Sequence, residues 1–555
     1  MDASKYRTGY FPVGSKYNEW TKKDHIEKAP VWCSVDMRDG NQSLIIPMSL
    51  EEKLEFFKVL LKVGFKEIEV GFPAASDTEY EFLRSLIDRK MIPDDVTIQV
   101  LTQCREHIIR KTFEACEGAE NVIMHFYNSL SRVQRDQVFD KSKEEIKQIA
   151  VDGAKLVKKL SAEYNGNFRF EYSPESFTGT EPEFALEVCN EVLDILGPSK
   201  ENKVIINLPA TMELSLPHIY ASQIEYMSKN LKYRDNVILS LHTHNDRGTG
   251  VAAAELALLA GAQRVEGTLF GNGERTGNVD IITMALNMYT HGVDPGLDFS
   301  NISYLVEEYE KCTGMHVYER MPYVGALVFA AFSGGHQDAI AKSMTYREKN
   351  AVKEWNVPYI PIDPSDIGRI YDGDIIRVNS LSGKGGIGFI LERNFGFDLP
   401  PKMREDVSYL CKGISDREHR ELRPNEILNI FSDNYLNLTG DITITDYEFM
   451  HAGKNVKIYI SFMKDNVETA VEAEGNGSLS AISNALKAYT GKKYILQVFT
   501  QHSMQGQGSQ SVAASYIGLE NEEKQMFWGA GTDTDVIKAS EKALMSAFFK
   551  LTKES

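Results

Sequence analysis

The chain has 555 residues, which is too long for one hydrophobic core, so about two to four domains are expected. A hydrophobic content of 42% and a charged content of 25% are ordinary for a globular protein, and a formal net charge of -18 without a long basic run argues against nucleic acid and anionic membrane surfaces as partners. The six cysteines are scattered singly, and no apolar run approaches the ~20 residues of a membrane span, so we expect a cytoplasmic protein.

The first 295 residues alternate between predicted strands and helices. After a polar arm, residues 1–29, short apolar runs alternate with amphipathic stretches, which is the pattern of repeated βα units. The predicted strands, in chain order, are Val31–Asp36, Glu67–Gly71, Thr97–Thr102, Asn121–Phe126, Phe168–Tyr172, Lys203–Leu208, Val237–Leu241 and Arg264–Leu269. Eight such units in roughly 250 residues predict a (β/α)8 or TIM barrel over residues 30–295, with its active site at the carboxyl ends of the strands.

Two histidines close the seventh predicted strand. Alternate side chains of a strand share a face, so His242 and His244 point the same way. In a closed barrel the first and eighth strands are close by, which lets Asp39 and Asn278 approach them. Two imidazoles, a carboxylate and an amide oxygen suit Zn²⁺, Mn²⁺ or Mg²⁺. Taken alone, the histidines could instead be held by local hydrogen bonds, and Asp39 could cap a helix or pair with Arg38.

None of the eight predicted strand ends carries a lysine, so activation of a carbonyl through a Schiff base has no candidate residue. Chemistry on carbon–carbon bonds would then depend on a metal and on proton transfer. A metal that binds a 2-oxo acid polarises its carbonyl group as a Lewis acid. Arg38 is placed to stabilise the charge that develops on the oxygen, although it could also serve only as the partner of Asp39.

Five segments of the barrel region together resemble the 2-isopropylmalate synthase family: Arg38–Gln42, Ser173–Glu175, Asn207–Thr211, His242–Asp246 and Gly271–Arg275. The broader superfamily of acyl-CoA Claisen synthases and lyases shares the first and the fourth. The resemblance implies condensation of acetyl-CoA with 2-oxoisovalerate and hydrolysis to CoA and 2-isopropylmalate, the first committed step of leucine biosynthesis.

The same resemblance implies roles for individual side chains of the barrel. The metal ligands would be Asp39, His242 and His244, with Asn278 binding directly or through water. Arg38, His125 and Thr211 would contact the 2-oxo acid, Leu101, Ser173, Asn207 and Pro209 would line the pocket for its side chain, and Glu175 would belong to the acid/base machinery.

The residues of the side-chain pocket bear on the substrate. Because they carry no full positive charge, they disfavour a homocitrate synthase, which must hold a second carboxylate, and favour a branched apolar substrate. A citramalate synthase is harder to exclude, because one or two methyl groups are worth only ~1–3 kcal/mol of discrimination. A 3-hydroxyacyl-CoA lyase and a metabolite sensor without catalysis are further alternatives. A regulatory tail argues against the lyase, and the complete set of strand-end residues argues against the sensor.

The βα alternation stops after Pro295, and residues 296–425 form a predicted linker region with helices at Asn301–Cys312 and Pro322–Phe332. In the family that the chain resembles, this linker crosses to the barrel of the second subunit of a homodimer. His336 and Tyr359 match its catalytic contributors there. Without the resemblance, a surface histidine and a packed tyrosine would be as good an interpretation.

The last predicted domain, residues 426–555, contains a faint internal repeat of the α+β type. Each half has strands that end in Gly-x-Gly before a helix: Gly475-Asn476-Gly477 before Leu479–Tyr489, and Gly529-Ala530-Gly531 before Val536–Leu551. Its resemblance to the leucine-binding regulatory domain of the family implies feedback inhibition by leucine. We expect the effector at Gly475, Asn476 and Gly477, because the start of a helix offers exposed backbone N–H groups.

Overall fold

The computed structural model describes residues 1–330, 334–369, 384–418, 422, 424–453, 455–504 and 511–553. The chain divides into two compact units, the first made of Met1–Val328 and Pro364–Arg369 and the second of Phe329–Asp363 and Ile370–Ser555. The first unit therefore includes the N-terminal arm and the beginning of the predicted linker region. In the part of the chain that is described, no helix is long and apolar enough to cross a membrane.

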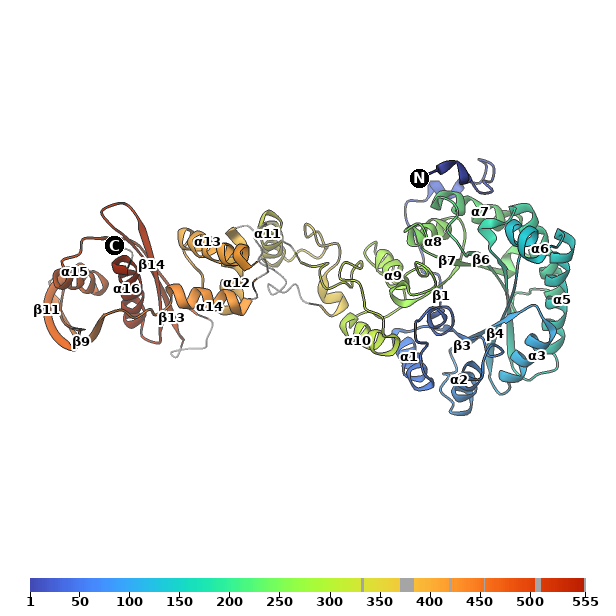
Figure 1. Cartoon of the computed structure of the whole chain (residues 1–555), viewed down its shortest axis with the longest axis horizontal. Helices are drawn as coiled ribbons and strands as arrows, with labels where there is room; N and C mark the ends of the chain where they lie inside the picture. Colours follow the sequence, from blue (N-terminus) through green and yellow to red (C-terminus); the bar gives the residue numbers. More distant parts are fainter. Residues whose placement is uncertain are drawn as a thin grey trace. The chain divides into compact units, whose positions relative to one another are not determined.

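The first unit contains a closed barrel of eight parallel strands, which confirms the predicted fold. The strands are β1 Val31–Ser34, β2 Glu67–Gly71, β3 Thr97–Gln103, β4 Asn121–Ser129, β5 Asn167–Glu175, β6 Val204–Ala210, β7 Val237–Thr243 and β8 Arg264–Gly267. They follow one another around the barrel in chain order, and β8 pairs with β1. Figure 1 shows the helices of this unit surrounding the strands.

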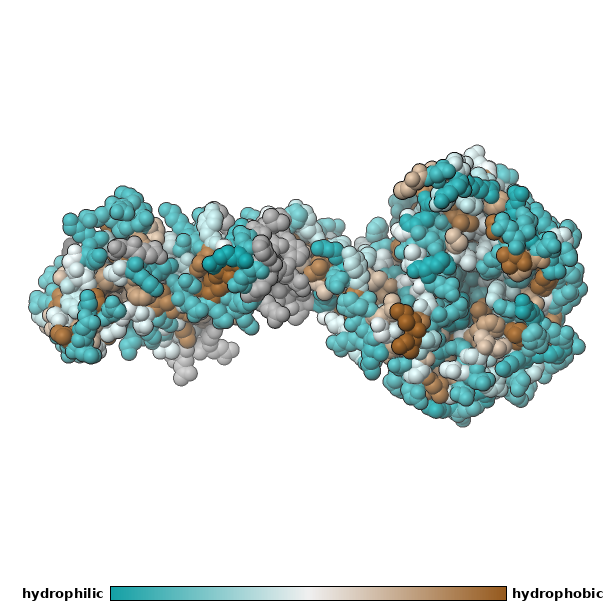
Figure 2. Space-filling view, viewed as in Figure 1, coloured by the Kyte–Doolittle hydropathy of each residue, from teal (hydrophilic) through white to brown (hydrophobic). Residues whose placement is uncertain are grey.

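The longer helices between and after these strands are α1 Leu50–Val63, α2 Asp77–Asp88, α3 Glu106–Ala115, α5 Lys143–Ser161, α6 Pro182–Leu196, α7 Pro217–Asn230, α8 Gly250–Leu259, α9 Ile281–Tyr289 and α10 Ile302–Thr313. Local sequence sets their limits. Helix α1 begins at a capping box formed by Ser49 and Glu52 and ends at Gly64, whose φ of 105° would strain any other residue. Figure 2 shows a barrel surface that is mostly hydrophilic, with apolar side chains in small separate patches.

Several strands differ in length from the prediction, and the difference matters for the site. Strands β4 to β7 extend further, so that Glu175, Pro209 and His242 lie in the sheet rather than after it, and Pro209 is in register with His242. Strand β1 ends earlier than predicted because the chain forms a turn, in which the backbone N–H groups of residues 38 to 40 donate hydrogen bonds to the carbonyl oxygen of Val35. The turn is η3, Asp36–Gly40.

One predicted helix is wrong. Residues 322–330 of the predicted helix Pro322–Phe332 form turns, and its last two residues lie outside the described part of the chain. The physical reason is that Tyr323 adopts a φ of 63°, in the left-handed region, which interrupts a right-handed helix. The other predicted helix of this region is confirmed as α10.

The second unit begins with helices α11 Gly334–Asn350, α12 Lys384–Phe395, α13 Pro401–Glu418 and α14 Pro424–Tyr435. Two similar halves follow. The first consists of β9 Ile442–Ala452, β10 Asn455–Lys464, β11 Val467–Gly475 and α15 Ser478–Thr490, and the second of β12 Ile495–Ser503, β13 Ala513–Glu520, β14 Met526–Asp533 and α16 Val536–Lys553. Each half has a three-stranded antiparallel sheet followed by a helix, as the predicted repeat requires.

The two Gly-x-Gly segments have different places in these halves. The first ends β11 and leads into α15, whereas Gly529 and Gly531 lie inside β14, which corrects the prediction that both segments end their strands. A Cβ atom on Gly531 would lie 2.2 Å from the backbone oxygen of Ala539, and one on Gly529 would lie 2.3 Å from that of Ala543. These glycines therefore allow α16 to pack closely on β14.

Candidate active site

A pocket of about 560 Å³ opens at the carboxyl ends of the barrel strands. Every residue of the barrel that the sequence predicted for the site lines it, except Asn278. The lining is formed by Arg38, Asp39, Gln42, Phe72, Ala75, Leu101, Gln103, His125, Tyr127, Ser173, Glu175, Asn207, Pro209, Thr211, His242, His244, Glu274 and Arg275. The structure therefore brings together residues from η3 and from seven further strands or the loops that follow them.

Asp39, His242 and His244 form a buried group whose ligand atoms lie within 4.8 Å of one another. The Nε2 atoms of His242 and His244 lie 3.3 and 3.7 Å from Oδ2 of Asp39. This oxygen is buried and accepts no hydrogen bond among the described residues. Asp39 is held in place by η3, where the neighbouring Asp36 accepts a hydrogen bond of 3.0 Å from the backbone N–H of Leu269.

The amide of Asn278 completes this arrangement. Its Nδ2 donates to the backbone oxygen of Asn272 at 3.0 Å, which leaves Oδ1 buried and without a partner in the described part of the chain. A backbone bridge between Asn278 and His244 keeps the amide beside the histidines. Buried polar atoms without partners are rare unless a ligand satisfies them. The two unsatisfied oxygens and the two imidazoles therefore fit a divalent metal.

Burial and neighbouring charges shift the pKa values of all three residues of this group. Burial lowers the pKa of His242, but its contacts with Asp39 and Glu266 outweigh burial and raise the pKa to about 9. Burial and then the charge of His242 lower the pKa of His244 to about 4. Burial alone would raise the pKa of Asp39, but the guanidinium of Arg38, whose Nη1 lies 3.0 Å from Oδ1, holds it well below its usual range.

The predicted side-chain pocket combines the apolar Leu101 and Pro209 with polar side chains and contains no lysine or arginine. Ser173 links its members, because its Oγ accepts a hydrogen bond of 3.0 Å from Nδ2 of Asn207 and lies 2.8 Å from Nε2 of His125. The other ring nitrogen of His125 lies 2.7 Å from Oε2 of Glu69. Neighbours inside the barrel thus hold the amide nitrogen of Asn207 and both ring nitrogens of His125, whereas Oδ1 of Asn207 is buried without a partner among the described residues.

Glu175 and Thr211 lie at the rim of the same pocket. Oε1 of Glu175 accepts a hydrogen bond of 2.8 Å from Oγ of Ser176, and Oγ1 of Thr211 accepts one of 3.0 Å from the backbone N–H of Ser176. The backbone oxygen of Thr211 in turn accepts from Arg275 at 2.5 Å. Two βα loops and the loop that carries Asn278 are therefore joined around the pocket.

Some residues of the site were not assigned from the sequence. The lining also includes five residues to which the sequence assigns no role: Gln42, Gln103, Tyr127, Glu274 and Arg275. A deeper layer inside the barrel was missed altogether: Glu69, Gln99, Glu171, Arg264 and Glu266, all buried. The available signal was their spacing, because these polar residues stand at alternate positions of otherwise apolar strands.

Two predicted catalytic residues, His336 and Tyr359, belong to the second compact unit and not to the unit that holds the pocket. Their rings stack on each other, with centroids 3.9 Å apart and planes inclined by 20°. The side chain of Tyr359 is 60% exposed, and its φ of 65° holds it in the left-handed region. Both residues are therefore accessible in a single chain.

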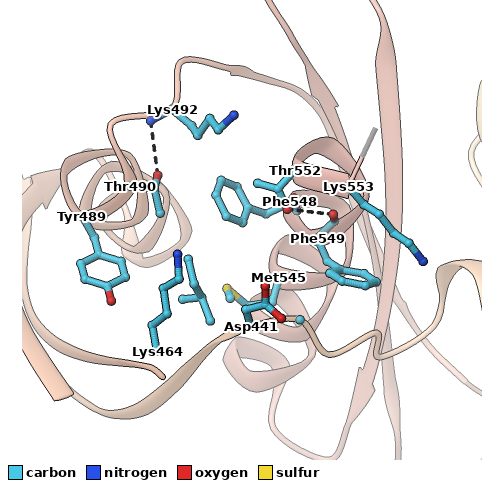
Figure 3. A pocket seen from close by; sticks show the side chains of 12 residues that line it. Asp441, Lys464, Tyr489, Thr490, Lys492, Met545, Phe548, Phe549, Thr552 and Lys553 are labelled. Atoms are coloured by element: carbon cyan, nitrogen blue, oxygen red, sulfur yellow. Dashed lines mark hydrogen bonds between the residues drawn. The ribbon is translucent and has the colours of Figure 1, made fainter. Parts of the chain in front are cut away.

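The predicted effector residues lie at the start of α15. Gly475 is buried, Asn476 is exposed, and Gly477 caps the helix with an extended backbone and no side-chain hydrogen bond. A separate pocket of about 550 Å³ lies at the other ends of α15 and α16. Figure 3 shows Tyr489 and Lys464 on one side of this pocket and Phe548 and Phe549 on the other.

Comparison with known proteins agrees with the three regions of the chain. A family model described as HMGL-like matches residues 29–307, one described as an alpha-isopropylmalate synthase post-catalytic domain matches residues 326–392, and one described as a LeuA allosteric (dimerisation) domain matches residues 421–552. A 2-isopropylmalate synthase of Helicobacter hepaticus is 58% identical over 99% of this chain and 100% of its own length. The chain belongs to the 2-isopropylmalate synthase family.

Further members of the 2-isopropylmalate synthase family are similar in sequence to this chain over nearly its full length. The synthase of Desulfitobacterium hafniense is 57% identical over 100% of this chain and 99% of its own, and that of Acetoanaerobium sticklandii is 51% identical over 99% and 97%. The barrel is the metal-dependent catalytic domain of a transferase. Among the described residues, Asp39, His242 and His244 form one group that could hold a metal, and Glu69, His125 and Glu266 form another. The resemblance carried by the five barrel segments is confirmed.

Proposed function

We propose that the barrel condenses acetyl-CoA with 2-oxoisovalerate to give 2-isopropylmalate and CoA. The observation that supports this most is that the metal group and the uncharged side-chain residues line one pocket of about 560 Å³. Asp39, His242 and His244 would hold the metal, which would polarise the keto group of a 2-oxo acid. The branched side chain of the acid would lie against Leu101, Asn207 and Pro209.

The reaction divides into proton transfer, condensation and hydrolysis. A bound divalent metal supplies Lewis-acid polarisation of the keto group. The methyl group of acetyl-CoA loses a proton to a base, its carbon forms a bond to the keto carbon, and the keto oxygen gains a proton. Arg38 stabilises the charge on that oxygen, and Glu175 is our candidate within the acid/base machinery. Water then cleaves the thioester, which releases the CoA thiol and a carboxylate.

The side-chain pocket favours 2-oxoisovalerate over substrates with a second carboxylate. Asn207 donates to Ser173 and to Glu266, both at 3.0 Å, and His125 contacts Ser173 and Glu69, so none of these groups offers a free cation. Pyruvate, the substrate of a citramalate synthase, differs only in methyl groups. We expect it to react more slowly by about 10- to 200-fold for a loss of about 1–3 kcal/mol.

We also propose that the protein is a homodimer in which each subunit contributes side chains to the active site of the other. His336 and Tyr359 would enter the pocket from the partner chain. In support, the loops after β1 and β6 beside the pocket expose apolar side chains, with Ile45 95% and Ile46 81% accessible and Met212 about half accessible at 48%. Exposed apolar side chains beside a catalytic pocket fit a surface that another chain covers.

We further propose that leucine inhibits the enzyme by binding at Gly475, Asn476 and Gly477 in the C-terminal domain. Gly477 leaves room for a small ligand, because a Cβ atom placed on it meets no atom within 4 Å. A cytoplasmic location is also part of the proposal. All six cysteines are free, as a reducing compartment would keep them.

The reaction is tested by the release of free thiol from acetyl-CoA in the presence of different 2-oxo acids. We expect kcat/KM to be highest with 2-oxoisovalerate, lower with pyruvate and negligible with 2-oxoglutarate, and we expect chelation to abolish turnover until a divalent metal is restored. A higher kcat/KM with pyruvate would identify a citramalate synthase instead. Cleavage of a 3-hydroxyacyl-CoA without condensation would identify a lyase.

A further inference from the structure

Glu266 lies directly beneath the metal group and has no assigned role. It belongs to β8, in register with His242 of β7, and it is only 1% exposed. Its Oε2 lies 2.9 Å from Nδ1 of His242, while Nε2 of the same ring lies 3.3 Å from Asp39. One ring nitrogen thus contacts a buried carboxylate inside the barrel, and the other faces the metal group.

The carboxylate of Glu266 is fixed from several directions. Oε1 accepts hydrogen bonds from Nη1 of Arg264 at 2.9 Å and from Nε2 of Gln99 at 2.7 Å, and Oε2 accepts one from Nδ2 of Asn207 at 3.0 Å. Arg264 also forms an ion pair with this carboxylate. The carboxylate therefore cannot rotate without breaking these bonds.

Glu266 also belongs to a second acidic group, with Glu69 and His125, whose ligand atoms lie within 4.8 Å of one another. This group does not need a metal. Glu69 forms an ion pair with Arg38, and Glu266 forms one with Arg264. Both nitrogens of His125 already contact neighbours, Glu69 on one side and Ser173 on the other. The carboxylates of this group thus have partners within the protein, and Oε2 of Glu266 faces Nδ1 of His242.

We propose that Glu266 is a positioning residue that holds Nδ1 of His242 as its N–H donor, so that Nε2 carries the lone pair toward the metal. A carboxylate in this position selects the tautomer, fixes the plane of the ring and makes the ligand more basic. Through Asn207, which bonds both Glu266 and Ser173, the same carboxylate connects the metal ligand to the side-chain pocket. The inference rests on the metal-dependent function proposed above.

The test compares Glu266→Gln with a matched variant of the same layer, Glu171→Gln. Glu171 is fully buried and lies 3.2 Å from Arg264 and 3.5 Å from His125, but no contact joins it to His242 in the described structure. We expect Glu266→Gln to weaken metal binding by about 10- to 100-fold, measured by competition with a chelator, while Glu171→Gln binds metal as the original chain does. Thermal unfolding of the metal-free proteins shows whether the two variants fold equally well.

Glu266→Asp keeps the charge but shortens the side chain, and it serves if Glu266→Gln does not fold. We expect a weaker metal site and an altered visible absorption spectrum when Co²⁺ is bound, because the ring of His242 is no longer held in place. Unchanged Co²⁺ affinity and spectrum in a folded variant would overturn the proposal, and so would an equal loss of affinity in Glu171→Gln. If the original chain itself bound no divalent metal, the proposed function would fail, which is a separate result.

Discussion

At the scale of single residues, the proposed metal ligand His242 would couple metal binding to the release of a proton. Its pKa of about 9 means that it is protonated at neutral pH in the absence of metal, whereas a metal ligand must be the neutral imidazole. His244, with a pKa of about 4, needs no such proton loss. Metal binding between pH 7 and 9 should therefore release about one proton from this pair, so that raising the pH favours the bound form.

This coupling predicts a metal affinity that rises about tenfold per pH unit from pH 7 to 9 and levels off above pH 9. The measurement is competition with a chelator at each pH, corrected for the protonation of the chelator. A buffer series with the same metal and ionic strength serves as the control. An affinity that does not change over this range would show that His242 is already neutral and that its contact with Glu266 does not favour the charged form.

A second prediction concerns Glu175. Its carboxylate lines the pocket and accepts a hydrogen bond from Ser176, and no contact joins it to Asp39, His242 or His244 in the part of the chain that the structure describes. We expect Glu175→Gln to lower kcat by about 100- to 10,000-fold with little change in KM for the 2-oxo acid, because an amide cannot exchange the proton. Steady-state thiol release measures both constants. A raised KM with a normal kcat would make Glu175 a binding residue.

The residues of the pocket rim could be predicted because each lies at the end of a recognisable strand, as His242 does, or shortly after one, as Asp39 does. The buried polar residues beneath the rim, inside the barrel, could not be predicted in this way. Glu171 and Glu266 stand inside strands, where a single sequence gives no register, and their partners are set by which strands pair and how far each is shifted. The role of a buried arginine such as Arg264, which donates hydrogen bonds to Glu67 and Glu266, can be recognised only when the carboxylates around it are known.

At the scale of elements, the order of strands and helices in the barrel was predictable, but several ends were not. The alternation of apolar runs fixed the count of eight, while hydrogen bonds with neighbouring strands decided how far β5, β6 and β7 extend. The sequence predicts a strand end at Gly529 and Gly531, whereas both glycines lie inside β14. Glycine in a sequence marks either a turn or a close approach, and only the packing of α16 distinguishes the two.

This close approach gives a prediction for the C-terminal domain. A methyl group on Gly531 would meet backbone atoms of α16, so we expect Gly531→Ala to lower the free energy of unfolding of this domain by about 1–3 kcal/mol. The matched control is Gly477→Ala, where the backbone is extended and the added Cβ meets nothing within 4 Å. Chemical unfolding of the full chain measures both. Equal stabilities for the two variants would contradict the packing argument.

At the scale of the whole molecule, the proposed homodimer predicts complementation between inactive chains. Glu175→Gln removes a barrel residue, and His336→Ala removes a residue of the second unit. If His336 serves the partner's barrel, each mixed dimer regains one intact site. Random pairing of the two chains should then restore about a quarter of the original activity, since half of the dimers are mixed and half of their sites are complete.

Complementation is measured as thiol release after the two variants are produced together in equal amounts. The control is a mixture of Glu175→Gln with Arg38→Ala. Because both residues line the same pocket of one barrel, no dimer of these chains contains an intact site. Activity restored in the first mixture and not in the second supports sites shared between subunits. No recovery in either mixture would place His336 in the site of its own chain or outside it.

Regulation also belongs to this scale, because the proposed leucine residues and the catalytic pocket lie in different compact units. We expect Gly477→Asp to keep its basal activity and to lose inhibition by leucine, since the added carboxylate would occupy the open space at the start of α15 and repel the carboxylate of the effector. A coupling of about 1–3 kcal/mol corresponds to a shift of about 5- to 150-fold in apparent affinity, which a leucine titration of thiol release detects.

Two further variants locate the effector within the C-terminal domain. Lys464→Gln changes the pocket at the other ends of α15 and α16 without touching the Gly475–Gly477 turn, and a chain that ends before Pro424 lacks both. Loss of inhibition in Gly477→Asp and in the shortened chain, but not in Lys464→Gln, supports the turn as the site. Loss in Lys464→Gln alone would move the site to the pocket. Leucine that still inhibits the shortened chain by competing with the 2-oxo acid would mean that it binds in the barrel, and the C-terminal domain would then act in dimerisation and not in sensing.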